Sequence, residues 1–298
     1  MNEQGHIPVL LEEVLNCLNT AREGTYVDCT LGLAGHALEI LKRNPKASLI
    51  GFDIDENSLL IAKKRLRPYA SRVQLYYSDF RYLPDLKIDF ASIRGIMLDL
   101  GISSFQLDSP ERGFSFNSEG PLDMRLDVRH KITASKILNQ YSEPKLAHLF
   151  QEFGELKQAK KLAQQIATRR RVRKIETTTE LRQLVEEVCH WRPQKGKIHP
   201  AAKVFQALRI EVNHELESLS GFLKRIVQLI PPQSRLAVLS FHSLEDRIIK
   251  HTFAELASPD NNHPLLNILT KKPVTPSEEE VARNSRAHSA KLRAAEKI

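Results

Sequence analysis

The chain has 298 residues, of which 41% are hydrophobic and 27% are charged, and its formal net charge is +8. This composition is typical of a globular protein and excludes a disordered or fibrous chain. No apolar run approaches the length of a membrane helix, and the N-terminal stretch is amphipathic and acidic, unlike a basic signal peptide. We therefore expect a cytoplasmic protein without a membrane partner.

A nucleotide-binding βαβ unit is predicted near the start of the chain. A strand over residues 25–29 leads through a glycine-containing turn into a helix over 35–43. A second strand over 48–52 then ends at Asp53. An acid at this place accepts hydrogen bonds from ribose hydroxyls in dinucleotide-binding folds. The unit therefore predicts an adenosine-bearing cofactor.

The turn alone is a weak signal. It holds only Gly32 and Gly35, whereas the dinucleotide fingerprint has three glycines. An ordinary strand-to-helix turn could contain the same residues. Asp53 favours the nucleotide site, because a carboxylate at the end of a buried strand needs hydrogen-bond donors. Asp55, two residues later, could instead cap the following helix.

The alternation of helices and strands continues after this unit. A helix is expected over 57–66, and strands over 73–77 and 95–100. From about Leu107 a polar, glycine-bearing loop leads into helices only, until a strand returns at 235–241. The fold class is therefore α/β, a parallel doubly wound sheet interrupted by an all-helical insertion.

The expected domains follow from this interruption. Residues 1–108 and 214–298 form one discontinuous nucleotide-binding domain, and residues 109–213 form the helical insert. Ligands of open α/β sheets bind beyond the carboxyl ends of the strands. That rule gathers the following residues around one crevice: Gly32, Gly35, Asp53, Asp79, Asp99 and His242.

The helical insert carries a basic run. Eight Lys and Arg residues lie between Lys157 and Lys174, with no acid among them. A second basic group follows, made of Lys195, Lys197, His199 and Lys203. A solvated helix face would interleave Glu with Lys for i,i+4 support, so we interpret the run as a phosphate-binding surface.

Two helix starts are predicted from their sequence patterns. Thr177 and Glu180 have the spacing of a capping box, and Ser243 with Asp246 has the form of an N-cap followed by an acid. The segment 269–298, rich in Lys, Arg and Glu, is expected to be partly extended, either contacting RNA or covering the sheet edge.

The three cysteines form no recognisable pattern. Cys17, Cys29 and Cys189 are far apart and include no Cys-x-x-Cys pair, so neither a disulfide framework nor a zinc cluster is supported. We interpret them as small buried hydrophobic residues and expect no metal site.

Several long segments closely resemble the bacterial small-subunit ribosomal RNA methyltransferase H family, also called MraW, and the match runs nearly end to end. These segments are His6–Val14, Asp99–Asp108, Glu111–Phe116, Gly120–Arg125, His199–Ala201, Phe205–Ile210 and Ser240–Arg247.

The resemblance implies a class I methyltransferase domain and an enzyme dependent on S-adenosylmethionine. The implied reaction is methylation of the exocyclic N4 of a cytidine in the decoding region of 16S rRNA, on the small ribosomal subunit. The helical insert would then be the RNA-recognition domain. Carried over by position, the cofactor contacts are Ala34, Gly35, His36, Asp53, Phe80, Asp99 and Gln106.

Asp99 and His242 are the residues that we expect to be catalytic. Asp99 would orient the target amine or the ammonium group of the cofactor. His242 either contacts the base or a phosphate, or is a hydrogen-bonded structural residue. Asp123 and Arg125 lie on the glycine-bearing loop, where either substrate recognition or an internal ion pair fits their types.

Three positions depart from the usual pattern of the family. Ala34 stands where a glycine is usual, Cys29 also replaces a glycine, and Phe105 replaces a proline. A positive φ at Ala34 would cost about 1 kcal/mol or more. A nicotinamide-dependent oxidoreductase and a non-catalytic RNA-binding protein are the rival interpretations, and the sequence leaves open whether the protein is a homodimer.

Overall fold

The computed structural model describes residues 8–194, 197–259 and 263–298. The chain forms two compact units. The sheet unit comprises residues 1–101 and 216–298, and the helical unit comprises residues 102–215. The helical unit thus begins earlier than residue 109, where the change of pattern suggested a boundary.

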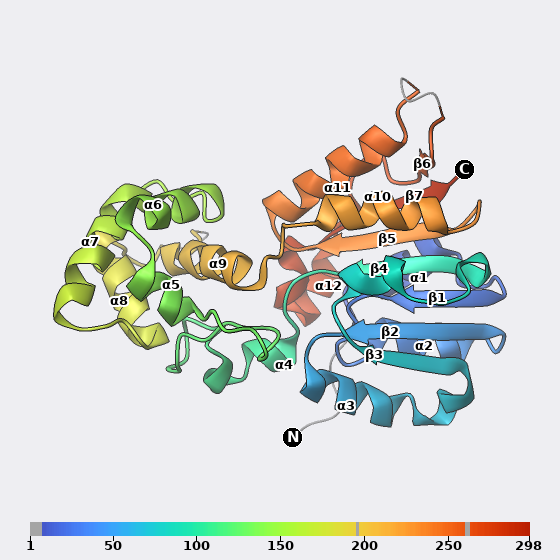
Figure 1. Cartoon of the computed structure of the whole chain (residues 1–298), viewed down its shortest axis with the longest axis horizontal. Helices are drawn as coiled ribbons and strands as arrows, with labels where there is room; N and C mark the ends of the chain where they lie inside the picture. Colours follow the sequence, from blue (N-terminus) through green and yellow to red (C-terminus); the bar gives the residue numbers. More distant parts are fainter. Residues whose placement is uncertain (1–7, 195–196, 260–262) are drawn as a thin grey trace. The chain divides into compact units, whose positions relative to one another are not determined.

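The described part of the sheet unit is built on a seven-stranded sheet with the order β3-β2-β1-β4-β5-β7-β6 (Figure 1). The first five strands are parallel, and β7 runs antiparallel to both of its neighbours. The strands are β1 Gly24–Asp28, β2 Ala47–Asp53, β3 Val73–Tyr77, β4 Ile93–Asp99, β5 Arg235–Ser240, β6 Leu266–Ile268 and β7 Lys291–Lys297.

The five strands expected from the sequence are present and parallel, and the strands β6 and β7 complete the sheet. The segment 269–298 contributes β7, which lies inside the sheet between β5 and β6 rather than over its edge. Charged residues concealed this strand in the sequence. Their charges are balanced by partners: Arg293 Nε lies 2.6 Å from Asp246 Oδ1, and Glu296 pairs with Arg235 at 2.7 Å.

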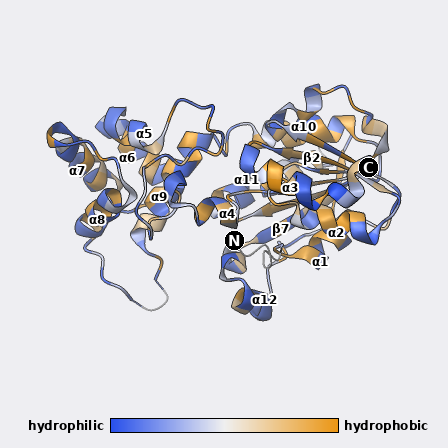
Figure 2. Ribbon diagram, turned by 90° about the horizontal axis from the view of Figure 1, so that it is seen from below, coloured by the Kyte–Doolittle hydropathy of each residue, from blue (hydrophilic) through white to orange (hydrophobic). Residues whose placement is uncertain are grey.

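Helices cover both faces of the sheet because alternate strand residues point to opposite sides. Val27, Ile96 and Val238 belong to a core shared with α10 and α11, whereas Tyr26 and Met97 pack on the side of α1. Hydrophobic colouring along the strands is visible in Figure 2. The helices of this unit are α1 Leu11–Leu18, α2 Gly35–Arg43, α3 Glu56–Arg65, α10 Leu219–Leu229, α11 Ser243–Leu256 and α12 Glu278–Arg283, with short 3-10 turns η1 Arg67–Arg72, η2 Phe80–Asp85, η3 Phe90–Ser92 and η5 Ser285–Ser289.

The helical unit encloses its own hydrophobic core. Apolar residues predicted to form helix faces, such as Leu149, Phe150 and Leu184, are buried in it. The capping box of Thr177 and Glu180 is confirmed at the start of α8. The helices are α4 Ser104–Leu107, α5 Ala134–Gln140, α6 Glu143–Glu152, α7 Ala159–Val172, α8 Thr178–Cys189 and α9 Pro200–Asn213, with the 3-10 turn η4 Pro110–Arg112.

The described residues bear on the expected absence of membrane helices and on the state of the cysteines. None of the described helices combines the length and the apolar character needed to cross a membrane. The three cysteines are free thiols; Cys29 is buried, as expected, whereas Cys17 and Cys189 are only half-buried.

Candidate active site

Three acidic residues end three neighbouring parallel strands of the sheet unit. Asp28 ends the central strand β1, while Asp53 and Asp99 end β2 and β4 on either side of it. Burial raises the pKa of Asp28 to about 8, and the negative charges of Asp99 and Asp53 contribute to the increase. The carboxyl ends of these strands therefore form an acidic group of three residues.

Asp28 is a site residue that the sequence prediction missed. It is almost completely buried, and its Oδ1 accepts a hydrogen bond from the Thr30 backbone N–H at 3.2 Å. The available signal was its position, because an acid at the end of β1 must share an edge with acids ending the adjacent parallel strands.

Asp53 holds the turn that follows β1. Its Oδ2 accepts from the Gly32 N–H at 2.7 Å, and its Oδ1 accepts from the Asp55 N–H at 2.8 Å. Burial nevertheless raises its pKa to about 6, while backbone hydrogen bonds from Asp55, Gly32 and Ile54 act in the opposite direction. Asp55 caps α3, as the sequence suggested, by accepting from Asn57 and Ser58.

Ala34 adopts the left-handed conformation, with a φ of 61°, and is fully buried. Alanine therefore replaces the usual glycine at a position where the left-handed conformation costs an L-residue about 1 kcal/mol or more. The next residue, Gly35, begins α2 and lies against Pro8. A Cβ on Gly35 would stand 2.6 Å from Pro8 Cγ, so close packing alone requires glycine there.

His36 connects the turn to the acidic group. Its ring is buried, and its Nε2 lies 3.0 Å from the Val9 carbonyl oxygen. Because a carbonyl can only accept, Nε2 carries a proton and donates it to this bond. The other ring nitrogen, Nδ1, lies 3.9 Å from Asp99 Oδ2.

Asp99 presents the accessible carboxylate of the acidic group. Its backbone N–H donates to Thr30 Oγ1 at 2.6 Å, which fixes the residue, while 28% of its side chain is exposed. Within the described residues, no donor forms a hydrogen bond to this carboxylate. Burial raises its pKa to about 7, and the charge of Glu245 adds to the effect. The carboxylate is thus suited to accept hydrogen bonds from a ligand.

Phe80 follows β3 at the same edge of the sheet. Its ring packs edge-to-face against Phe222 of α10, with the centroids 4.9 Å apart. The neighbouring Asp79 is engaged with Arg81, whose Nε lies 2.9 Å from Asp79 Oδ1. The structure therefore brings Phe80 to the strand ends but gives Asp79 an ion-pair partner of its own.

His242 follows β5 and is the N-cap of α11. Its Nδ1 accepts from the Glu245 N–H at 3.4 Å, and Glu245 Oε2 accepts from the backbone N–H groups of Phe241 and His242. The predicted N-cap at Ser243 was wrong: Ser243 is the first helical residue, and Asp246 pairs with Arg293 of β7. His242 thus has a structural role as the N-cap of α11.

Gln106 belongs to α4 of the helical unit. It is buried there, and its Oε1 accepts from the Ser103 N–H at 3.0 Å while its own N–H donates to Ser103 Oγ at 3.2 Å. Asp123 and Arg125 of the same unit form an internal ion pair at 2.7 Å, and Arg125 also donates to the carbonyls of Val128 and His130. This pair fixes the glycine-bearing loop.

The basic run on α7 is partly neutralised by α8. Arg169 lies 3.4 Å from Glu187, and Arg173 lies 3.1 Å from Glu180. Arg170 donates to the Leu138 carbonyl at 2.7 Å. The exposed basic residues for which no ion pair is found within the described residues are Lys157, Lys160, Lys161, Arg171 and Lys174. Of the second basic group, Lys195 lies outside the described residues.

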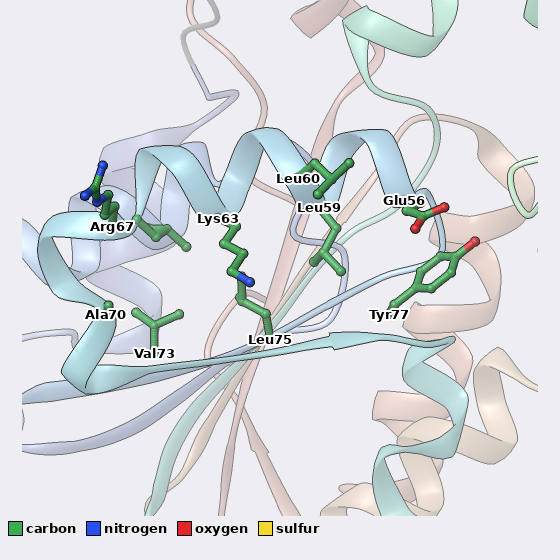
Figure 3. Close-up of a pocket in the computed structure, with 10 residues that line it drawn as sticks. Glu56, Leu59, Leu60, Lys63, Arg67, Ala70, Val73, Leu75 and Tyr77 are labelled. Carbon is green, nitrogen blue, oxygen red and sulfur yellow. The ribbon is translucent and has the colours of Figure 1, made fainter.

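A hollow of about 420 Å³ lies between α3 and β3 (Figure 3). Its lining includes Leu59, Leu60, Lys63, Leu75 and Tyr77. None of the predicted cofactor residues lines it, so it is separate from the acidic group.

The chain was compared with known proteins. The sequence model of the MraW methylase family matches residues 3–298. The ribosomal RNA small subunit methyltransferase H of Carboxydothermus hydrogenoformans is 44% identical over 311 residues, covering 99% of each chain. The protein of that name from Caldicellulosiruptor saccharolyticus is 45% identical, covering 98% of this chain and 99% of its own. A solved rRNA methylase from Streptococcus thermophilus has a TM-score of 0.43 to this chain at 11% sequence identity, covering 99% of each chain.

Proposed function

The chain belongs to the MraW methylase family, and from this premise we propose that it methylates small-subunit ribosomal RNA with S-adenosylmethionine as the methyl donor. The proposed target is the exocyclic N4 of a cytidine in the decoding region of 16S rRNA, on the assembled or assembling subunit in the cytoplasm. The target atom is what the resemblance of the sequence segments implies, whereas the relatives named as ribosomal RNA small subunit methyltransferase H support the methylation of small-subunit ribosomal RNA.

The acidic group formed by Asp28, Asp53 and Asp99 is the main observation that supports S-adenosylmethionine as the cofactor. Burial raises the pKa of all three, so ionising each carboxylate costs free energy, and a neighbouring negative charge adds to that cost at each of them. A ligand with a net positive charge relieves that cost. S-adenosylmethionine carries a sulfonium and an ammonium group, whereas the pyrophosphate of a nicotinamide dinucleotide would be repelled. The rival oxidoreductase interpretation is therefore disfavoured.

The predicted contacts divide along the strand ends. Asp53 accepts backbone N–H groups with both of its oxygens, from Gly32 with Oδ2 and from Asp55 with Oδ1, and we assign it to the ribose hydroxyls. Phe80, one strand further out, is assigned to the adenine side. Ala34, Gly35 and His36 form the start of α2 beside the acidic group, and we assign Gln106 to the methionine end.

Asp99 is the proposed catalytic residue. When bound, S-adenosylmethionine supplies an electrophilic methyl group. A cytosine amine is a poor nucleophile, because its lone pair is delocalised into the ring. The partly exposed carboxylate of Asp99 can accept a hydrogen bond from this amine and hold its nitrogen in line, and positioning of this kind supplies a large part of many rate enhancements. With a pKa of about 7, Asp99 can also hold the proton that the amine loses.

His242 is the second proposed catalytic residue. It follows β5, whose partner strand β4 ends at Asp99, so the two residues lie at the same edge of the sheet. Its ring is held by the capping interaction with Glu245, which orients it for contact with the base or a phosphate.

The test is a methylation assay with identification of the product. Purified protein is incubated with isotopically labelled S-adenosylmethionine and small subunits from cells that lack the enzyme, and labelled nucleosides are identified by mass spectrometry. Label on cytidine N4 is expected, and Asp99→Asn should remove most of it while leaving the protein folded. Label on another nucleoside would reject the proposed target atom, and subunit binding without label would favour the non-catalytic interpretation.

A further inference from the structure

Four rings of the helical unit form a continuous aromatic row. Phe205 of α9 is buried, and Phe116 packs edge-to-face against it at 5.7 Å. His199 stacks on Phe116, with the centroids 5.1 Å apart and the planes 24° apart. Trp191, just after α8, lies 5.0 Å from His199. The row thus leads from the hydrophobic core to Trp191 at its outer end.

The inner rings of the row are held rigidly. His199 is the N-cap of α9, so its Nδ1 accepts from the Ala201 N–H at 3.1 Å, while Nε2 lies 3.0 Å from Glu186. Glu186 is fixed in turn by Arg182 at 2.7 Å. A ligand that stacks on such a row loses little free energy to ordering of the protein, because the rings are already in place.

Trp191 has the properties of a contact residue. It is half-buried, does not belong to the core cluster of the helical unit, and follows the last turn of α8. Within the described residues, its indole N–H has no hydrogen-bond partner. The neighbouring Ile198 is 71% exposed. A large ring with an unused polar atom is typical of surfaces that recognise a partner.

The segment that carries Trp191 and His199 is basic. The chain carries no acid between Glu187 and Glu211. Arg192 and Lys197 are exposed, and neither has an ion-pair partner within the described residues. Lys161 of α7 adds a third positive charge, because its Nζ lies 3.3 Å from the ring of His190, next to Trp191. The nearest acid, Glu186, is already paired.

We propose that Trp191 is a stacking platform for an unpaired RNA base, with Arg192 and Lys197 binding the adjacent phosphates. Aromatic faces flanked by basic residues are the features that hold single-stranded nucleic acids, since each base offers a π face and each nucleotide a phosphate. The choice of RNA as the polymer rests on the proposed function. The base-holding site itself rests on the aromatic row and the charges around it.

The chain contains one tryptophan, so its intrinsic fluorescence reports on Trp191 directly. Full-length protein is titrated with a short single-stranded RNA, with a duplex of the same sequence, and with an abasic strand that keeps the phosphates. We expect saturable quenching by the single strand only. In parallel, the anisotropy of a labelled strand measures the affinity, which Trp191→Ala should lower about 5- to 150-fold and Trp191→Phe much less. Tyr82→Ala, which removes a 61% exposed ring of the sheet unit, is the matched control and should leave it unchanged.

The outcomes separate this proposal from the proposed function. Binding of the single strand without quenching, together with wild-type affinity of Trp191→Ala, would overturn the stacking platform even if the wild-type protein methylates subunits. Equal quenching by the abasic strand would also overturn it, because no base would then be needed. Quenching and a Trp191-dependent affinity in a protein that transfers no methyl group would support the platform and reject the enzyme. If Trp191→Ala fails to fold, wild-type quenching and Trp191→Phe decide.

Discussion

Affinity for S-adenosylmethionine should depend on pH through Asp99. Its pKa is raised to about 7, and the ionised carboxylate is the form that attracts a cationic ligand. The sign follows from this: affinity is present above the pKa and is lost as the pH falls through it. A single carboxylate with this pKa is about half ionised at about pH 7.0 and only a few per cent ionised at about pH 5.5. The dissociation constant should therefore rise about 15-fold between these two values, or about 1.6 kcal/mol.

Equilibrium dialysis with labelled S-adenosylmethionine at constant ionic strength measures this change. Asp99→Asn removes the titrating group, so the variant should bind more weakly at neutral pH and show a much flatter profile. Asp28 and Asp53 titrate with Asp99 as a coupled group, and they account for the slope that remains. Asp85→Asn is the control, because Asp85 is an exposed acid paired with Arg225 and should leave the profile intact. An Asp99→Asn variant that keeps the full 15-fold change would refute the assignment.

Three further predictions concern single positions. Gly35→Ala should lower the free energy of unfolding by about 1–3 kcal/mol, because the added Cβ collides with Pro8. The Cβ added by Gly221→Ala on α10 meets no atom within 4 Å, so this variant should instead raise the free energy of unfolding by about 0.5–1 kcal/mol. Thermal unfolding measures both changes. His242→Ala should cost about 1 kcal/mol through loss of the α11 cap, whereas His242→Asn restores a cap. If His242→Asn is stable yet inactive in the methylation assay, the catalytic role holds; full activity would reduce His242 to a cap. Arg171→Gln should weaken RNA binding without changing stability, and it should reduce by about 1 the magnitude of the slope of log binding constant against log salt concentration. Arg170→Gln should instead lower the melting temperature, because it loses the hydrogen bond to the Leu138 carbonyl. Equal salt slopes for the wild type and Arg171→Gln would contradict the predicted phosphate contact.

The local pattern predicted the parts of the fold that local forces decide. The helix at 35–43 was predicted at its observed ends, and the alternation of buried strands gave the correct α/β class. β7 could not be recognised in this way, because the pairing of Arg293 with Asp246 joins residues that are distant in the sequence. A strand whose charges are neutralised by remote partners looks like a solvated segment.

The candidate site shows the same limit. Asp53 could be identified from its place after a strand, and its contact with the turn is local to the βαβ unit. The raised pKa of Asp28 comes first from burial, to which the charge of Asp99 adds, and both the burial and this neighbour on another strand arise only through folding. The N-cap was predicted at Ser243 because Ser is a common N-cap. The cap is His242 instead, because Glu245 accepts hydrogen bonds from the backbone N–H groups of Phe241 and His242.

The place of β7 in the sheet has a consequence for folding during synthesis. The helical unit is one contiguous stretch of chain, complete once residue 215 has emerged, whereas β5 stays without a neighbour on one side until residues 291–297 are made. An unpaired strand edge promotes aggregation of incomplete chains. On the ribosome the helical unit should therefore fold first, and the sheet that carries the acidic group should close last, so a nascent chain acquires its proposed RNA-binding surface before its proposed cofactor site.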